Sequence, residues 1–196
     1  VSASGENAIV VASGANGALA PEDIVACTPD SHGVFLAQLE SPLQSIKALF
    51  SGAAARRGTT ILNAAPANAA GVALFALTDI LVVNETELAS FAGMPDAPVS
   101  KDALIVAARG LICRDGQTVV VTIGADGAVV VDATQSYDVP GCRVQVKDTT
   151  GAGDCFCGAL AAGLGEGLPV NSALRLAVTA ASISVVFRSG SLVVAI

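Results

Sequence analysis

Short apolar runs alternate with longer helical patterns along most of the chain, and this alternation constrains the fold more than any other feature. Runs rich in Val, Ile and Leu predict buried strands, whereas the segments between them repeat apolar residues at helical spacing. Strand–helix–strand repetition is typical of right-handed crossovers that build a mainly parallel sheet with helices on both faces. The predicted strands are residues 7–11, 33–40, 59–63, 79–84, 118–124 and 127–132, and the predicted helices are 41–58, 85–93, 100–116, 153–166 and 170–187.

Turn and capping residues refine these boundaries. Ser41 and Pro42 mark the start of the first long helix and Gly58 its end, because Pro suits the first helical turn and Gly suits the helix end. The sequence GADG lies between two apolar runs and predicts a hairpin within 118–132, the one antiparallel piece expected. The predicted class is α/β, with three layers and a mainly parallel, doubly wound sheet.

Composition agrees with a sheet covered on both faces and argues against several functions. Hydrophobic residues make up 53% of the chain, charged residues 14%, and the mean hydropathy is +0.66; strands buried on both faces need no polar side. No apolar run approaches the roughly 18–20 residues that span a bilayer, and no signal-like segment opens the chain, so we expect a cytoplasmic protein without a membrane partner. The net charge of −7 argues against a nucleic-acid partner.

The cysteines and the single histidine exclude further kinds of site. No C-x-x-C pair occurs, and the cysteine count is odd, which argues against a zinc site or a disulfide framework. With only His32 available, Ser–His–Asp or Cys–His catalysis is also disfavoured. Free thiols fit a reducing compartment. The cysteines are Cys27, Cys113, Cys142, Cys155 and Cys157.

The segment DTTGAGD, residues 148–154, allows two interpretations. Residues 151–153 are small enough for backbone N–H groups to converge on an anion at a helix start, where Asp154 could accept a proton during phosphoryl transfer. Alternatively, Thr or Asp caps the helix and the glycines form the turn, which is the commoner role of so short a pattern. The segment lacks the Lys of a P-loop, and Phe156 breaks a G-x-G-x-x-G motif.

Three other segments place polar residues at predicted strand ends. Asn84 and Glu87 have the spacing of a capping box, but Glu87 could also orient the waters of a Mg²⁺ ion. The sequence TIGADG, residues 122–127, is either a hairpin turn or a nucleotide contact. Glu40 ends a strand and is either an ordinary surface carboxylate or a ligand contact, because ligands bind at the carboxyl ends of parallel strands.

Together these segments resemble the ribokinase branch of the carbohydrate-kinase family. DTTGAGD matches the family signature D-T-x-G-A-G-D without interruption, and DILVVNETELASFAG (79–93) resembles its D-x-x-x-x-N-E-x-E-A segment. ILNAAPA (61–67) is similar to V-x-x-N-P-A-P-A with alanine in place of the first proline, and SGANGAL (13–19) is similar to G-A-N-x-x-L. The resemblance implies a ribokinase-like three-layer α/β/α fold.

The resemblance also implies an activity and a cofactor set. The family transfers phosphate from ATP to a sugar hydroxyl. The ribokinase resemblance implies D-ribose as the sugar and D-ribose 5-phosphate as the product. It also implies Mg²⁺ on the phosphates and K⁺ as an activating cation. Asp154 would be the general base, and Gly151, Ala152 and Gly153 would form the anion hole. Glu40 would reach the sugar.

The remaining implied roles concern the nucleotide and the two metal ions. Glu87 would serve Mg²⁺, and the K⁺ site would comprise Asp148, the Thr150 carbonyl and Gly190. The residues that would bind the nucleotide are Asn84, Thr122, Gly124, Ala125, Asp126, Gly127 and Gly153.

The family's N-terminal third, including its sugar-binding Asp and its lid, has no counterpart in this chain. The chain opens at Val1 and closes with SLVVAI, so we expect residues 1–196 to be one truncated α/β domain that is weakly active or inactive, and the intact protein to dimerise through the lid. Another sugar or nucleoside kinase, or a nucleotide-binding module without turnover, are the alternatives. An oxidoreductase is disfavoured because no G-x-G-x-x-G follows the first strand.

Overall fold

The computed structural model describes residues 13–28 and 31–187. The strand predicted at 7–11 lies outside these residues. The strands are β1 (Val34–Gln38), β2 (Thr59–Asn63), β3 (Ile80–Asn84), β4 (Thr118–Thr122), β5 (Gly127–Val131) and β6 (Ser136–Pro140). The helices are α1 (Gly14–Gly17), α2 (Pro21–Cys27), α3 (Leu43–Ala55), α4 (Glu85–Phe91), α5 (Lys101–Gly110), α6 (Ala152–Gly165) and α7 (Val170–Ser184), with 3-10 helices η1 (Ala69–Leu77) and η2 (Gly124–Asp126).

The six strands form one sheet in sequence order, β1-β2-β3-β4-β5-β6. Strands β1 to β4 are parallel, and β5 and β6 are added antiparallel. Because β1 to β4 run the same way, their carboxyl ends meet at one edge of the sheet, where ligands bind in such folds.

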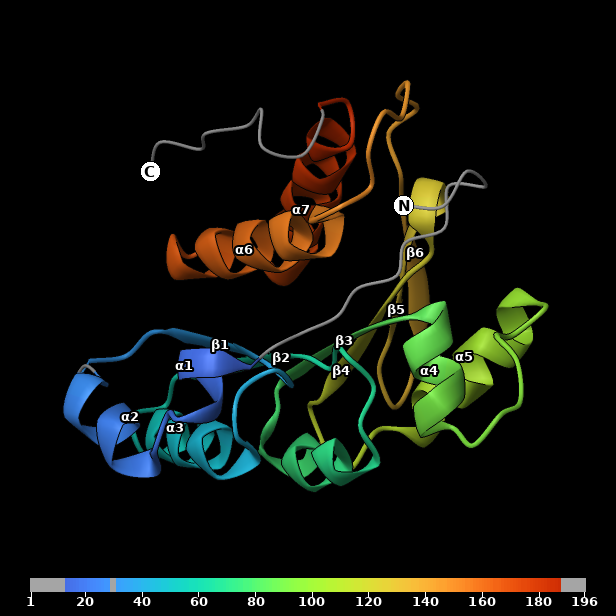
Figure 1. The fold of residues 1–196 in the computed structure, drawn as a ribbon. Helices are drawn as coiled ribbons and strands as arrows, with labels where there is room; N and C mark the ends of the chain where they lie inside the picture. The colour runs from blue at the N-terminus through green and yellow to red at the C-terminus, as the bar shows by residue number, and fades with distance from the viewer. Residues whose placement is uncertain (1–12, 29–30, 188–196) are drawn as a thin grey trace.

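Helices cover both faces of the sheet, as Figure 1 shows, with α3 and η1 on one side and α6 and α7 on the other. One apolar core joins Phe50 of α3 and Phe75 of η1 to sheet residues such as Val83. The other joins Phe156 and Leu160 of α6, together with residues of α7, to the opposite sheet face. The predicted three-layer α/β class is confirmed.

Individual boundaries differ from the predictions. The predicted strand 59–63 coincides with β2. The first long helix, predicted to begin at residue 41, begins at Leu43 with Pro42 as its N-cap. After this helix, Arg57 rather than Gly58 takes the left-handed conformation, with a φ of +56°. Strand β6 is absent from the predictions, because only Tyr137 and Val139 supply its apolar alternation.

None of the described helices combines the length and hydrophobicity needed to cross a bilayer.

The β4–β5 hairpin is confirmed, and glycine is required where it meets β6. Gly127 has a φ of +97°, and a Cβ there would lie 2.2 Å from the Val139 carbonyl oxygen. The Gly141 N–H donates to the Asp126 carbonyl at 3.0 Å, which ties the turn to the chain after β6. Gly124 also has a positive φ, +57°, but a Cβ there would meet no atom within 4 Å.

We expect Gly127→Ala to lower the free energy of unfolding by about 2–4 kcal/mol, because it combines a strained φ with a backbone clash. The matched control Gly124→Ala carries the φ strain alone and should cost about 1 kcal/mol. Urea denaturation followed by circular dichroism measures both. Equal losses in the two variants would show that the contact with β6 does not matter.

Candidate active site

Polar residues occupy the carboxyl ends of the four parallel strands. Gln38 ends β1 and pairs in register with Asn63, which ends β2. Asn84 ends β3 and pairs with Thr122, which ends β4. Parallel register therefore places four polar side chains along the edge where a ligand would lie.

Helix α6 begins at this edge with a left-handed turn. Its N-cap is Gly151, with φ +76° and ψ 4°, and the Ala152 N–H donates to the Thr149 carbonyl at 3.2 Å. Among the described residues no side chain caps this helix, so the interpretation that Thr or Asp caps it is wrong. A helix start without a side-chain cap leaves first-turn amides for an anion.

The two carboxylate oxygens of Asp154 face different parts of the site. Oδ1 accepts a hydrogen bond from Nε2 of Gln38 at 3.0 Å. Oδ2 lies 3.9 Å from the position that a Cβ on Gly151 would occupy. One oxygen is therefore tied to the sheet, and the other lies beside the glycine turn at the start of α6.

Asn84 and Glu87 form the predicted capping box of α4. The Glu87 N–H donates to Asn84 Oδ1, and the Asn84 N–H donates to Glu87 Oε2, both at 2.8 Å. Burial raises the pKa of the Glu87 carboxyl from its ordinary value of 4.5, and the hydrogen bond from Asn84 only partly offsets this. A nearby hydrated cation would offset the desolvation cost of this carboxylate charge.

The buried thiol of Cys157 is affected by both carboxylates. Burial raises its pKa to about 12, and the negative charges of Asp154 and Glu87 add to the shift. Both negative charges therefore disfavour the thiolate form of this buried group. The thiol stays protonated at neutral pH and is not a nucleophile.

A pocket of about 540 Å³ lies between the β4–β5 turn and the start of α6. Thr122 and the η2 turn line it on one side, and Ala152 and Gly153 line it on the other. Its far wall is formed by apolar residues of α6 and α7 such as Phe156 and Val178. The predicted nucleotide residues that line it are Thr122, Gly124, Ala125, Asp126, Gly127 and Gly153.

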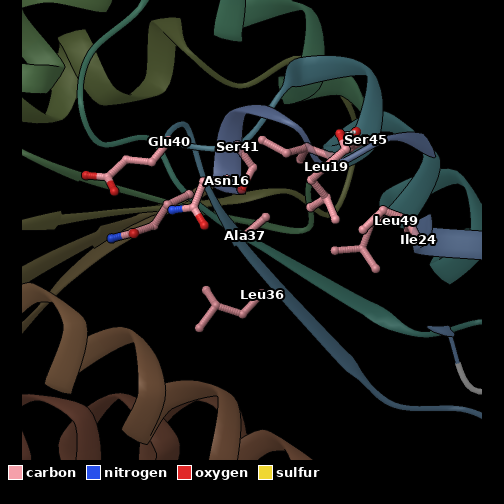
Figure 2. A pocket seen from close by; sticks show the side chains of 11 residues that line it. Asn16, Leu19, Ile24, Leu36, Ala37, Glu40, Ser41, Ser45 and Leu49 are labelled. Carbon is pink, nitrogen blue, oxygen red and sulfur yellow. Dashed lines mark hydrogen bonds between the residues drawn. The ribbon is translucent and has the colours of Figure 1, made fainter. Parts of the chain in front are cut away.

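A second pocket, of about 300 Å³, lies between α1, α2, β1 and α3. Figure 2 shows polar side chains, those of Asn16 and Glu40, at one end and apolar side chains such as Leu19 and Leu49 at the other. Glu40 was predicted to end the strand, but it lies in the turn after β1, which ends at Gln38. Gln38 lines this pocket and also contacts Asp154.

The loop before α6 contains two of the residues predicted to hold K⁺. The Thr150 N–H donates to Asp148 Oδ1 at 2.9 Å, and the Asp148 N–H donates to the Val185 carbonyl at 3.2 Å. Gly190, the third predicted residue, lies outside the described residues. Within residues 13–28 and 31–187, no group of three or more His, Cys, Asp or Glu residues could hold a metal ion by itself.

The sequence predictions missed several residues that the structure places at the site. Gln38 is part of the predicted strand 33–40 but not of the predicted site, although a polar residue at the carboxyl end of a strand itself indicates a ligand contact. Cys142, Arg143 and Ser182 line the larger pocket from the segment after β6 and from α7. No local pattern marks these three, because tertiary packing alone brings them to the pocket.

Solved structures share this fold. The crystal structure of ribokinase from Thermotoga maritima is similar with a TM-score of 0.78 at 29% identity, covering 96% of this chain and 63% of that one. Ribokinase from Arabidopsis thaliana, solved with ribose and ATP, gives a TM-score of 0.79 at 27% identity, covering 93% and 60%. The fold is therefore ribokinase-like.

Sequence comparison gives the family. The pfkB family of carbohydrate kinases matches residues 1–192, and the chain belongs to this family. It is 34% identical over 168 residues to ribokinase from Staphylococcus aureus, covering 85% of this chain and 55% of that protein. It is also 34% identical over 188 residues to deoxyribokinase from Salmonella typhi, covering 94% and 61%. The chain thus spans less than two thirds of these relatives.

We expect Glu87→Gln to stabilise the chain at about pH 7, because the folded-state pKa of Glu87 lies above its ordinary value of 4.5. The folded state then loses stability as the pH rises from 4.5 through the folded-state pKa. The variant keeps a capping-box residue but removes the charge, so its advantage should vanish below pH 4.5. Urea midpoints across this pH range measure the effect.

Glu85→Gln is the matched control, since Glu85 belongs to the same helical turn but not to the capping box. It corrects for the general benefit of removing one negative charge from a chain of net charge −7. A midpoint for Glu87→Gln that is no higher than that of Glu85→Gln at neutral pH would contradict the burial cost.

Proposed function

We propose that the protein is a sugar kinase that transfers the γ-phosphoryl group of ATP to a hydroxyl of ribose, giving ribose 5-phosphate and ADP. One observation carries the proposal: Asp154 is linked to both pockets through its neighbours, although it lines neither of them. The residues just before it, Ala152 and Gly153, line the larger pocket. Gln38, which donates a hydrogen bond to Asp154, lines the smaller one. A phosphate donor and an acceptor in these pockets would meet at this carboxylate.

The larger pocket suits a nucleotide. Its apolar wall, from Phe156 to Val185, offers a surface for a base, and the start of α6 offers amides for phosphates. Arg143 adds an exposed cation to the lining. Membership of the pfkB family and the similarity to a ribokinase solved with ATP support ATP as the donor.

In the proposed reaction Asp154 Oδ2 takes the proton of the attacking sugar hydroxyl. The hydroxyl oxygen then bonds to the γ-phosphorus as the bond from that phosphorus to the β–γ bridging oxygen breaks, and ADP leaves with that electron pair. The negative charge that develops on the transferred group would be stabilised by amides at the Gly151–Gly153 turn. Asp154 supplies the base and the turn supplies the anion hole.

The described residues offer oxygen ligands for the two cations that the family resemblance implies. Mg²⁺ bound to nucleotide phosphates keeps most of its waters and needs few protein ligands, and Glu87 with Asn84 offers one carboxylate and one amide near Thr122. When bound, Mg²⁺ would neutralise phosphate charge. Asp148 and Thr150 would hold K⁺ together with Gly190, which would stiffen the loop before α6.

The sugar is the part of the proposal with a close competitor. The polar end of the smaller pocket, with Asn16 and Glu40, can bind sugar hydroxyls, and Glu40 is the proposed ribose contact. A deoxyribokinase matches the chain at the same 34% identity as a ribokinase. Turnover measured with ribose, 2-deoxyribose and a nucleoside as acceptors separates these substrates, and ribose is expected to give the highest kcat/KM.

We expect Asp154→Asn to lower kcat for sugar phosphorylation by about 10²–10⁴-fold, the usual contribution of a general base, while the Kd for ATP stays unchanged. Coupled detection of ADP measures kcat, and calorimetry measures the Kd. Asp102→Asn is the control, because Asp102 is an exposed residue of α5 away from both pockets. Turnover by Asp154→Asn at the wild-type rate would show that Asp154 is not the base.

We expect ATP to protect Cys142 from alkylation, because this exposed thiol lines the proposed nucleotide pocket. Cys27 and Cys113 are also exposed but do not line that pocket, so they serve as internal controls. Mass spectrometry after a short iodoacetamide treatment gives the modified fraction at each site. Equal modification of Cys142 with and without ATP would place the nucleotide elsewhere.

A further inference from the structure

We propose that Gln38 is a positioning residue that holds the carboxylate of Asp154 in the orientation needed to accept the proton of the sugar. This inference rests on the proposed function and deepens it. The contact that carries it is the hydrogen bond from Gln38 Nε2 to Asp154 Oδ1, at 3.0 Å, between residues 116 positions apart in the sequence.

The amide donor comes from a rigid part of the molecule. Gln38 is the last residue of β1 and pairs in register with Asn63 of β2. The next residue, Leu39, is buried, and its N–H donates to the Ala65 carbonyl at 2.9 Å. The backbone that carries the Gln38 side chain is therefore fixed on both sides, so the amide donor extends from a fixed point at the strand end.

Asp154, in contrast, needs external support. It lies in the first turn of α6, its side chain is exposed, and its backbone follows the glycine turn at Gly151. An exposed aspartate samples several rotamers unless a partner selects one. The side-chain amide of Gln38 engages Oδ1, which leaves Oδ2 directed toward the Gly151 turn. The hydrogen bond therefore decides which oxygen faces the proposed phosphate site.

The chemical type of the partner suits a base. A Lys or Arg at this position would pair with the carboxylate charge and make it a poorer proton acceptor. A neutral amide orients the carboxylate through one hydrogen bond and leaves its charge in place. Gln38 also lines the pocket that contains Glu40, so the same strand end positions the base and borders the proposed sugar.

The kinetic test replaces the amide by an apolar side chain of similar size. Gln38→Leu should lower kcat for ribose phosphorylation by about 10–100-fold, the cost of a reacting group displaced by about 1 Å, while KM for ATP stays at the wild-type value. Gln44→Leu makes the same substitution at an exposed position of α3 that lines neither pocket, and it should leave kcat unchanged. A general loss of structure would instead change both constants.

A second test needs no turnover. In the ¹⁵N-labelled wild-type chain, the side-chain amide signals of Gln38, assigned by their loss in Gln38→Leu, should shift in Asp154→Ala because the acceptor is removed. They should not shift in Asp102→Ala. This measurement reports the contact itself, whatever the chain phosphorylates.

The outcomes separate the inference from the proposed function. A loss of kcat in Gln38→Leu but not in Gln44→Leu, together with a shift of the Gln38 amide signals in Asp154→Ala, supports the inference. Wild-type kcat in Gln38→Leu, a loss confined to KM for ATP, or an unmoved amide signal would overturn it. Absence of turnover in the wild-type chain would count against kinase activity of residues 1–196, and the amide signals would then decide the inference alone.

Discussion

The site depends on the burial of one face of α6 against the sheet. Phe156, Cys157 and Leu160 are almost fully buried in the core that includes Ile61 and Val120. Burying each large apolar side chain of this kind contributes about 1.5–3 kcal/mol. Because this face fixes the helix on the sheet, the first turn of α6 and its carboxylate must lie at the carboxyl ends of the parallel strands. The Gly151 turn and the hydrogen bond from β1 then determine how the carboxylate is aimed.

The position of α6 on the sheet also determines which charges lie at the site. Two carboxylates, Asp154 and Glu87, lie near the buried Cys157, in a chain whose net charge is −7. A polyanionic ligand can approach such a site only if local donors outweigh the overall charge. The amides at the start of α6 and the guanidinium of Arg143 are the donors in the larger pocket, and a cation on the phosphates would supply the remainder.

Periodicity and turn chemistry predicted much of this arrangement. The apolar run 59–63 coincides with β2, the hairpin forms around GADG, and the alternation of elements predicted the layers correctly. Prediction was weaker where a signal was short or non-local. Strand β6 has only two apolar residues in alternation, and the pocket residues after it come together only through tertiary packing.

Local sequence patterns likewise predicted only part of the arrangement at the proposed site. The signature 148–154 indicated the proposed base, but not that Gly151 would cap the helix through its left-handed backbone alone. The role of Gln38 depends on a contact with a residue 116 positions away, which no local pattern encodes. Asn84 and Glu87 were open to two interpretations, and the structure shows the capping box directly.

A crystal structure of this chain with ADP and ribose tests the central claim, that Asp154 lies where donor and acceptor meet. We expect ADP in the pocket beside residues 122–127 and a ribose hydroxyl about 2.6–3.2 Å from Asp154 Oδ2, within hydrogen-bond reach of a general base. Nucleotide bound outside that pocket, or ribose bound with every hydroxyl beyond reach of Asp154, would contradict it.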